Sequence, residues 1–267
     1  MHKTIVITGA SSGIGEAAAK ALAAEGAHVC LVARRADELQ RVKEEIESEG
    51  GEASIYVADL SNLQAIDACC AQLLAEHERI DVLINNAGRS IRRSVKESLE
   101  RFHDYERTMQ LNYFGAVRMT LKLLPRMLAQ RKGHIINASS LSALIPTPRF
   151  SAYVASKSAL DGFSRTLAAE LIDDGITVTT INYPLVKTAM TAPTKVYKYL
   201  PQMDVKIAAQ WIVDAVKKKP SRKTNVFGET FGVITAALPG ATTRGFGRLY
   251  KIVGKRLQKR AEAEQQP

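Results

Sequence analysis

The feature that most constrains the fold is a regular alternation of short apolar runs with longer amphipathic stretches over the first two thirds of the chain. The short runs are nearly continuous in Val, Ile and Ala, which is typical of strands covered on both faces. We expect strands at residues 4–8, 28–33, 53–57, 82–85, 134–138 and 177–182, and helices at about 15–25, 36–49, 62–77, 100–129 and 151–172. This alternation predicts an α/β fold with one doubly wound parallel sheet and helices on both faces.

Composition excludes several classes of protein. Hydrophobic residues make up 46% of the chain and charged residues 24%, as in a globular protein. The chain has three cysteines, Cys30, Cys69 and Cys70. Their number is odd and no two of them form a CxxC motif, which argues against a disulfide scaffold or a four-cysteine zinc site. We therefore expect a cytoplasmic protein without a metal. No run approaches the roughly 20 apolar residues of a membrane span, and the strand-like start argues against a signal peptide.

A glycine-rich segment follows the first expected strand and opens the first expected helix. It reads Thr8-Gly9-Ala10-Ser11-Ser12-Gly13-Ile14-Gly15. Glycines permit a tight turn and let the backbone approach a pyrophosphate, and the helix start offers free N–H groups to it. The alternative is a plain glycine-rich turn. In this context the segment predicts a single-domain Rossmann-type fold whose dinucleotide lies on Gly9, Ser11, Ser12, Gly13, Ile14 and Gly15.

The end of the second expected strand indicates which dinucleotide binds. An acid that would hold a ribose 2′-hydroxyl is absent there, and Arg34 and Arg35 follow instead. Arginine side chains suit a 2′-phosphate, so the sequence predicts NADP(H) over NAD(H). The alternative is that both arginines are merely solvated at a helix start.

Small and polar residues follow the third and fourth expected strands. Asp59 and Leu60 follow the third, and Asp59 could accept a bond from an adenine amino group or cap the helix that starts near Asn62. Asn86, Ala87 and Gly88 end the fourth strand at the same edge of the sheet, where ligands bind in open parallel sheets. We expect all five to contact the cofactor.

Five residues are candidates for a catalytic set. Tyr153 and Lys157 stand four residues apart at the start of an expected helix, on one face. An ammonium beside a phenol lowers the pKa of the phenol, which would suit Tyr153 to proton transfer. Taken alone, such a pair is usually an ordinary pair of helix-surface neighbours. Ser139 and Ser140 end the fifth strand and could hold a substrate oxygen or cap a turn. Asn112 lies inside a long helix, where its amide is either buried for a purpose or solvated.

Together these residues resemble the short-chain dehydrogenase/reductase family. The matching positions, which run in family order from about residue 4 to 190, are Thr8-Gly9, Gly13-Ile14-Gly15, Asn85-Asn86-Ala87-Gly88, Asn112, Ser140, Tyr153, Lys157, Pro184 and Val186-Lys187-Thr188. The resemblance implies that Tyr153 is the general acid/base, that Lys157 tunes its pKa and binds ribose, and that Ser140 holds the carbonyl oxygen. It also implies that Asn112 holds a water linking Lys157 to solvent. The family spacing selects Ser140 over Ser139.

The same resemblance extends to the nicotinamide pocket. It implies that Pro184, Val186 and Thr188 contact the nicotinamide end of the cofactor. Pro184-Leu185 stands where the family usually has Pro-Gly, so we expect the floor of the nicotinamide pocket to have a different shape from that of other family members.

A narrower resemblance connects the chain to bacterial fatty acyl-CoA reductases and related carbonyl reductases. It rests on residues 86–94, 101–115, 149–153 and 184–190. Our leading expectation is an NADPH-dependent reductase that interconverts a bulky lipophilic aldehyde or ketone and its alcohol. The first alternative is reduction of a fatty acyl-CoA to a fatty aldehyde, which fits lipid metabolism. An alternative of another class is an NADP-sensing binding protein without activity.

The substrate end of the predicted site has two candidate elements. Residues 188–204 contain Met190, Tyr197 and Leu200 and are expected to form a lid, or else an ordinary packed loop. The residues Arg89, Arg92 and Arg93 could meet an acidic group such as a phosphate of CoA, or could be solvated.

The C-terminal segment departs from the family pattern. Residues 217–267 contain 12 of the 37 Lys and Arg residues but 3 of the 27 Asp and Glu residues. Apolar residues recur on one helical face at Phe246, Leu249, Tyr250, Val253 and Leu257. This basic amphipathic helix could lie on the inner face of an anionic membrane through residues 241–260, or dock on its own domain or a partner subunit. We expect residues 1–216 to form the dinucleotide-binding and catalytic domain and residues 217–267 a basic extension, in a homodimer or homotetramer that binds no nucleic acid.

Overall fold

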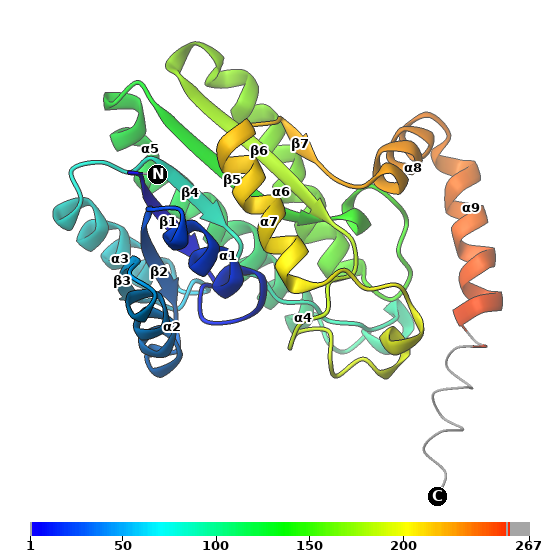
Figure 1. Cartoon of the computed structure of the whole chain (residues 1–267). Helices are drawn as coiled ribbons and strands as arrows, with labels where there is room; N and C mark the ends of the chain where they lie inside the picture. Colours follow the sequence, from blue (N-terminus) through cyan, green and yellow to red (C-terminus); the bar gives the residue numbers. More distant parts are fainter. Residues whose placement is uncertain (1, 255, 257–267) are drawn as a thin grey trace, which may run out of the picture.

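A computed structural model of the chain describes residues 2–254 and 256. Within them, seven strands form one parallel sheet in the order β3-β2-β1-β4-β5-β6-β7 (Figure 1). The strands are β1 (Thr4–Thr8), β2 (His28–Ala33), β3 (Glu52–Val57), β4 (Val82–Asn85), β5 (Gly133–Ser140), β6 (Ile176–Tyr183) and β7 (Arg222–Lys223). The first six agree with the expected strands to within two residues. The seventh was not expected, because two residues are too short to show any periodicity.

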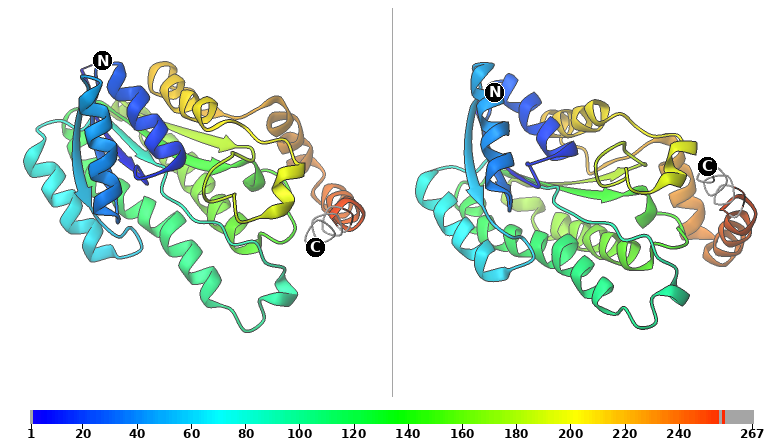
Figure 2. Two further views of the ribbon diagram at one scale, coloured as in Figure 1. Left: turned by 60° about the horizontal axis from the view of Figure 1, so that its bottom comes forward. Right: turned by 90° about the horizontal axis from the view of Figure 1, so that it is seen from below.

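Helices cover both faces of the sheet (Figures 1 and 2). One face carries α1 (Gly13–Ala24), α2 (Ala36–Ser48) and α7 (Val205–Lys218), and the other carries α3 (Leu63–Glu76), α5 (Gly115–Ala129) and α6 (Ser151–Glu170). Each face has its own apolar core. In β1, Ile5 and Ile7 join one core and Val6 joins the other, all fully buried. Burial of alternate residues on opposite faces confirms the doubly wound fold.

The expected long helix at residues 100–129 is interrupted. It consists of α4 (His103–Met109), a π-helical turn η2 (Gln110–Phe114) and α5. The π turn adds a residue to the local repeat and changes the direction in which its side chains project. Asn112 lies at its centre and is fully buried. Such turns inside helices often occur at functional sites.

Two helices follow the sheet at its β7 edge. They are α8 (Val226–Ala237) and α9 (Pro239–Leu249), and a π-helical turn η6 (Tyr250–Gly254) continues α9. Their aromatic rings meet, since the ring centroids of Phe231 and Phe246 lie 6.1 Å apart. The expected helix face agrees with α9 as far as it is described. Residues 255 and 257–260 of the expected membrane-facing stretch lie outside the described residues. Leu257 is among them.

Short 3-10 turns complete the chain. They are η1 (Val95–Glu97), η3 (Leu141–Ala143), η4 (Ile172–Asp174) and η5 (Lys195–Tyr199). In the part of the chain that the structure describes, no helix has both the length and the apolar character needed to cross a membrane.

Candidate active site

One cavity of about 920 Å³ opens at the carboxyl ends of the strands, where ligands bind in open parallel sheets. Its lining contains most of the predicted cofactor residues, namely Gly9, Ser11, Ser12, Gly13, Ile14, Arg34, Arg35, Asp59, Leu60, Asn86, Ala87, Gly88, Pro184, Val186 and Thr188. It also contains Ser140, Tyr153 and Lys157. Gly15 and Asn112 lie behind this surface. The fold therefore gathers into one place residues that are far apart in the sequence.

The phosphate loop requires its glycines. Gly9 has a φ of +69° and Gly13 a φ of +60°, backbone conformations that favour glycine. A Cβ at Gly9 would lie 2.9 Å from the Cα of Ala87, and one at Gly15 would lie 2.3 Å from the carbonyl oxygen of Gly9. The loop thus packs closely against the end of β4. Ser12 precedes α1 without a side-chain capping bond, so its first N–H groups are available to an anion.

Thr8 fastens this loop to the end of β4, a role that the sequence analysis did not assign. Its hydroxyl donates to the carbonyl of Ile84 at 3.2 Å and accepts from the backbone N–H groups of Asn86 at 2.9 Å and Ala87 at 3.0 Å. The side-chain amide of Asn86 donates back to the carbonyl of Thr8 at 3.0 Å. These bonds fix the distance between the two cofactor-binding loops. A hydroxyl residue directly before the first glycine was the available sequence signal.

The predicted adenosine end of the cavity contains two cations and one acid. Arg35 donates to the hydroxyl of Ser11 at 3.2 Å, which holds its side chain beside the phosphate loop. Asp59 accepts from the backbone and hydroxyl of Ser61 at 2.9 and 2.6 Å, and these bonds lower its pKa. The helix cap expected of Asp59 belongs to Asn62, whose side chain accepts from the first turn of α3. The bonds of the Asp59 carboxylate to Ser61 instead close a local turn.

Tyr153 and Lys157 lie one turn apart on α6, and Ser140 ends β5 beside them. The Lys157 ammonium is buried and donates to the carbonyl of Ala138 at 2.7 Å. The Ser140 hydroxyl accepts from the hydroxyl of Ser142 at 2.9 Å and caps η3. Ser139 is more deeply buried and donates to the backbone of Lys157 at 3.3 Å. Ser139 therefore has a structural bond, and Ser140 is the better placed to hold a substrate oxygen.

The direction of the Tyr153 pKa differs from our expectation. Burial raises it, and a hydrogen bond with Ser140 opposes the rise. Burial also lowers the pKa of Lys157 to about 8. The spacing of the two residues indicates only the charge of the lysine, whereas both groups also lose solvent in the cavity. The phenol therefore holds its proton at neutral pH, which suits a proton donor.

The side chain of Asn112 connects the loop after β4 to α6 near Lys157. Its side-chain oxygen accepts from the N–H of Arg89 at 2.8 Å, and its amide donates to the carbonyl of Arg89 and to the hydroxyl of Ser156, each at 2.9 Å. A Cβ at Gly88 would lie 3.3 Å from the Asn112 oxygen and 3.4 Å from the Lys157 nitrogen. The alternative of a solvated Asn112 is therefore wrong. The residue ties α6 to the loop after β4.

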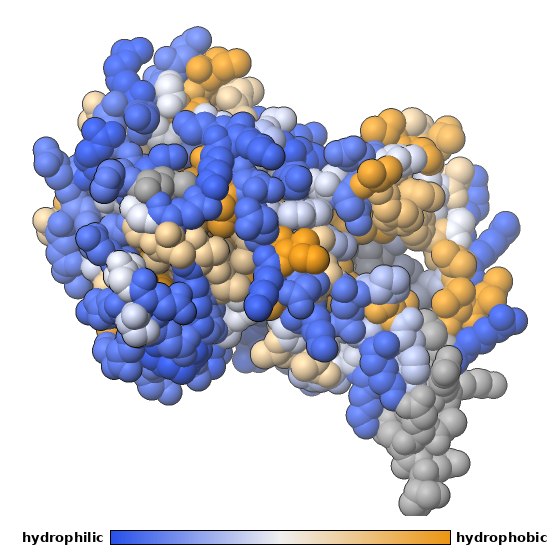
Figure 3. All heavy atoms as spheres, in the orientation of Figure 1, coloured by the Kyte–Doolittle hydropathy of each residue, from blue (hydrophilic) through white to orange (hydrophobic). Residues whose placement is uncertain are grey.

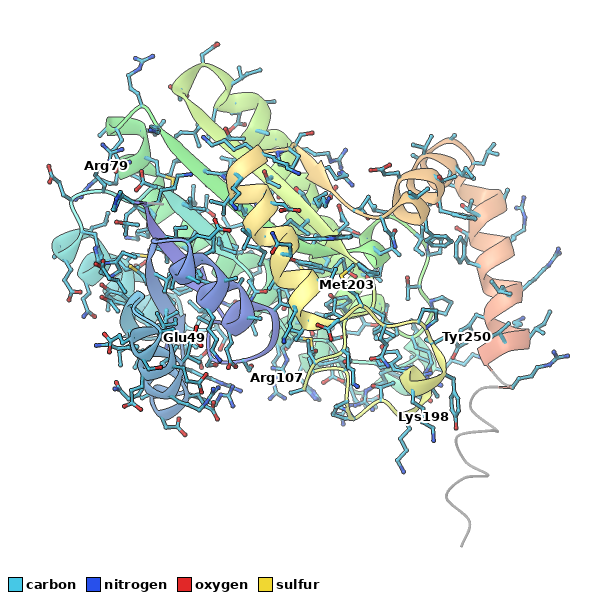
Figure 4. All side chains as sticks on the ribbon, in the orientation of Figure 1. Glu49, Arg79, Arg107, Lys198, Met203 and Tyr250 are labelled. Carbon is cyan, nitrogen blue, oxygen red and sulfur yellow. The ribbon has the colours of Figure 1, made fainter. Side chains whose placement is uncertain are left out.

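The half of the cavity away from the phosphate loop is largely apolar. Residues from η3 and the segment that follows it, from the expected lid, and from α9 and η6 form it, including Leu141, Ile145, Phe150, Met190, Val196, Tyr197, Leu200, Phe246, Leu249, Tyr250 and Val253. In Figure 4, Tyr250, the first residue of η6 after α9, faces the segment that carries Lys198. The helix α9 packs against α8, and its residues Phe246 and Leu249 contribute to the lining of the cavity.

A second cluster lies at the amino ends of the strands, away from this cavity. Ligand atoms of His28, Cys30 and His77 lie within 4.8 Å of one another, although the sequence predicted no metal. Burial raises the pKa of the Cys30 thiol to about 12, so this thiol is protonated near neutral pH.

Comparison with known proteins agrees with this arrangement. Residues 3–197 match the family model described as short chain dehydrogenase. A fatty acyl-CoA reductase of Acinetobacter baylyi is 54% identical over 237 residues, which are 89% of this chain and 80% of that protein. A second protein of that name, from Mycobacterium tuberculosis, is 48% identical over 82% of this chain and 75% of its own length.

Solved structures show the same fold. A putative NAD(P)-dependent gluconate 5-dehydrogenase from Beutenbergia cavernae, with bound NADP at low occupancy, has a TM-score of 0.75 and 30% identity over 83% of this chain and 93% of that chain. A metagenomic short-chain oxidoreductase in complex with NADP has a TM-score of 0.71 and 30% identity over 84% of this chain and 97% of that chain. The chain belongs to the short-chain dehydrogenase family, and it is an oxidoreductase with a nicotinamide cofactor site.

Proposed function

We propose that this enzyme uses NADPH to reduce a fatty acyl-CoA thioester to a fatty aldehyde with release of CoA. The observation that carries the proposal is one continuous cavity that joins Ser140 and Tyr153 to an apolar chamber beneath the lid and α9. Apolar walls of this kind favour a lipophilic chain over a sugar or a small polar acid. Two relatives named as fatty acyl-CoA reductases support the thioester over our leading expectation of an aldehyde or ketone.

The phosphate loop and the residues after β4 and β6 fit the cofactor. Gly9 and Gly15 leave no room for a side chain, and the open start of α1 suits a diphosphate. Arg34 and Arg35 would hold the 2′-phosphate, which is the basis for preferring NADPH to NADH. Val186 and Thr188 would contact the nicotinamide end. When bound there, NADPH supplies a hydride to the carbonyl carbon.

The residues of this chain then act on the carbonyl oxygen and its proton. Ser140 and Tyr153 would donate hydrogen bonds to that oxygen as negative charge grows on it. Tyr153, whose pKa is raised, transfers its proton to the oxygen, which gives a thiohemiacetal. As the C–S bond of this intermediate breaks, its hydroxyl returns the proton to Tyr153 and becomes the aldehyde carbonyl, and the CoA thiolate leaves and takes a proton from solvent. Lys157 places a positive charge beneath this pair, and Asn112 keeps α6 and the loop after β4 at the distance that the site requires.

The closest competing function is interconversion of a lipophilic aldehyde or ketone and its alcohol. It is favoured by the fact that Ser140 and Tyr153 can act on any carbonyl that reaches them. The two functions differ in their products. Reduction of a thioester releases one CoA thiol for each NADPH oxidised, and reduction of an aldehyde releases none.

The test is to follow NADPH absorbance and free thiol together, with palmitoyl-CoA and with hexadecanal as substrates. With palmitoyl-CoA we expect NADPH oxidation and, at initial rates before aldehyde accumulates, an equal rate of thiol release, and we expect hexadecanal to be reduced as well. Oxidation with hexadecanal alone would instead assign the enzyme to aldehyde reduction. Phenylacetaldehyde, which lacks a long chain, serves as the control for the apolar chamber.

The proposal includes a cytoplasmic homo-oligomer, a dimer or tetramer, that contacts the inner membrane surface through α8 and α9. Exposed apolar residues lie on and beside these helices, among them Val226, Phe227 and Val233 of α8, Leu238 between the helices and Ile252 of η6 (Figure 3). Arg244, Arg248 and Lys251 are exposed beside them, and α9 contains no acidic residue. An apolar surface bordered by cations complements an anionic bilayer.

Vesicle co-sedimentation tests this contact. We expect binding to vesicles that contain phosphatidylglycerol and weak binding to pure phosphatidylcholine. The triple variant Arg244→Gln, Arg248→Gln, Lys251→Gln should lose the difference. Equal binding of the wild type and the triple variant would contradict the contact.

A further inference from the structure

Arginines crowd around the loop after β4, and the structure divides them into two groups. The first group is paired with acids. Arg93 and Arg101 both donate to the buried carboxylate of Asp104, at 3.0 and 3.2 Å, and Arg149 pairs with Glu97 at 2.8 Å. These pairs fasten the loop to α4 and to the start of α6. Arg93, which we had considered as a contact for an acidic group, is therefore structural.

The second group consists of Arg89, Arg92 and Arg107. Among the described residues, no carboxylate lies within 4.0 Å of any of the three guanidinium groups, yet all three line the cavity. Arg107 lies on α4 at the lower edge of the molecule in the view of Figure 4. Unpaired guanidinium groups gathered on a concave surface form a site of positive potential.

These cations lie close enough to act on one another. Arg89 is half-buried, and its pKa is lowered first by burial and then by the charges of Arg107 and Arg34. The charge of Asp104 opposes this lowering and is the smallest of the four causes. Arg92 acts electrostatically on Tyr197 of the lid, and Tyr197 in turn interacts with Tyr153. The second group thus extends from the neighbourhood of Arg34, at the cofactor end of the cavity, to Tyr197 of the lid.

We propose that Arg89, Arg92 and Arg107 bind the phosphate groups of the CoA part of the substrate, while the acyl chain occupies the apolar chamber. Guanidinium groups pair with phosphate oxygens through two parallel hydrogen bonds, and the phosphates of CoA supply the negative charge that the protein does not provide. Arg34 and Arg35 are already assigned to the cofactor. A fatty aldehyde has no phosphate and would need none of these three residues.

This inference rests on the proposed function, and it predicts a selective kinetic defect. In Arg107→Gln and in Arg89→Gln, we expect the KM for palmitoyl-CoA to rise by about tenfold or more relative to the KM for hexadecanal. The increase should be larger for the double variant and smaller at high salt, because the contact is electrostatic. Lys96→Gln removes one exposed charge from the same loop region and should leave this ratio unchanged.

A second measurement does not depend on thioester reduction. Free CoA and adenosine 3′,5′-bisphosphate should inhibit hexadecanal reduction by the wild type and inhibit Arg107→Gln at least about tenfold more weakly. If the wild type does not reduce palmitoyl-CoA but is inhibited in this way, the proposed function fails and the arginine site stands. Equal inhibition of wild type and variant would overturn the site. A rise in the KM for NADPH in place of the KM for palmitoyl-CoA would overturn it too, by assigning these arginines to the cofactor.

Discussion

The phosphate loop offers a prediction whose size follows from the structure. In Gly15→Ala, the new Cβ would lie 2.3 Å from the backbone oxygen of Gly9 and 2.6 Å from the side-chain amide of Asn86. The amide is held by its bond to Thr8, so neither neighbour can move aside freely. Overpacking of this kind costs about 1–3 kcal/mol, whereas the better helix propensity of alanine returns about 1 kcal/mol. We expect net destabilisation of about 0–2 kcal/mol, a fall in Tm of up to roughly 8 °C.

The same shift should impair cofactor binding more than it impairs folding. The backbone of Gly9 must move by roughly 1 Å, and displacements of that size can cost about 100-fold in a positioned site. We expect the KM for NADPH to rise by at least about tenfold. Thermal unfolding and initial rates against NADPH concentration measure the two effects.

Gly245→Ala is the matched control for this variant. Gly245 also lies in a helix, and nothing lies within 4 Å of the position its Cβ would take. The same added methyl group should leave the KM for NADPH unchanged there. If Gly15→Ala behaves like Gly245→Ala, the close packing of the loop against β4 is not what the cofactor requires.

Three further predictions test the rest of the site. Tyr153→Phe should lower kcat by about 100-fold or more, because the proton donor is lost, with little change in NADPH affinity by fluorescence titration; near-normal turnover would remove Tyr153 from the mechanism. Arg34→Gln combined with Arg35→Gln should raise the KM for NADPH by about tenfold or more and leave that for NADH nearly unchanged, and a parallel change in both would show that the arginines do not read the 2′-phosphate. Because burial lowers the pKa of Lys157 to about 8, its ammonium is present below that pH and is lost above it. The value of kcat/KM for reduction should therefore fall as the pH rises through about 8, and a flat profile from pH 7 to 9 would argue against a required ammonium.

The parts of this molecule that the sequence predicts well are those encoded by neighbouring residues. The glycine loop needs only a strand, a turn and a helix in succession, and residues 4–24 supply all three. Tyr153 and Lys157 are four residues apart on one helix, so their placement on one face follows from helix geometry alone. The six longer strands are nearly continuous apolar runs, which makes their existence visible without knowledge of their neighbours.

The remaining features depend on contacts between distant residues. The π turn at Asn112 accommodates bonds to Arg89 and Ser156, which stand 23 and 44 residues away. The raised pKa of Tyr153 comes from the walls around it and not from its sequence neighbours. Which arginine after β4 is free and which is paired depends on the position of Asp104 on α4. Spacing along the chain contains none of this information.

The C-terminal helix shows why a correctly identified apolar face does not reveal what covers it. Periodicity placed Phe246, Leu249, Tyr250 and Val253 on one side of a helix, and the structure turns that side toward the cavity. No residue of α9 is itself buried, and Gly228 is the buried residue of α8, so this wall is held by far less buried surface than the sheet and its helices. Regions with few buried contacts open at the lowest free-energy cost. The apolar chamber is therefore expected to open most readily by displacement of α9.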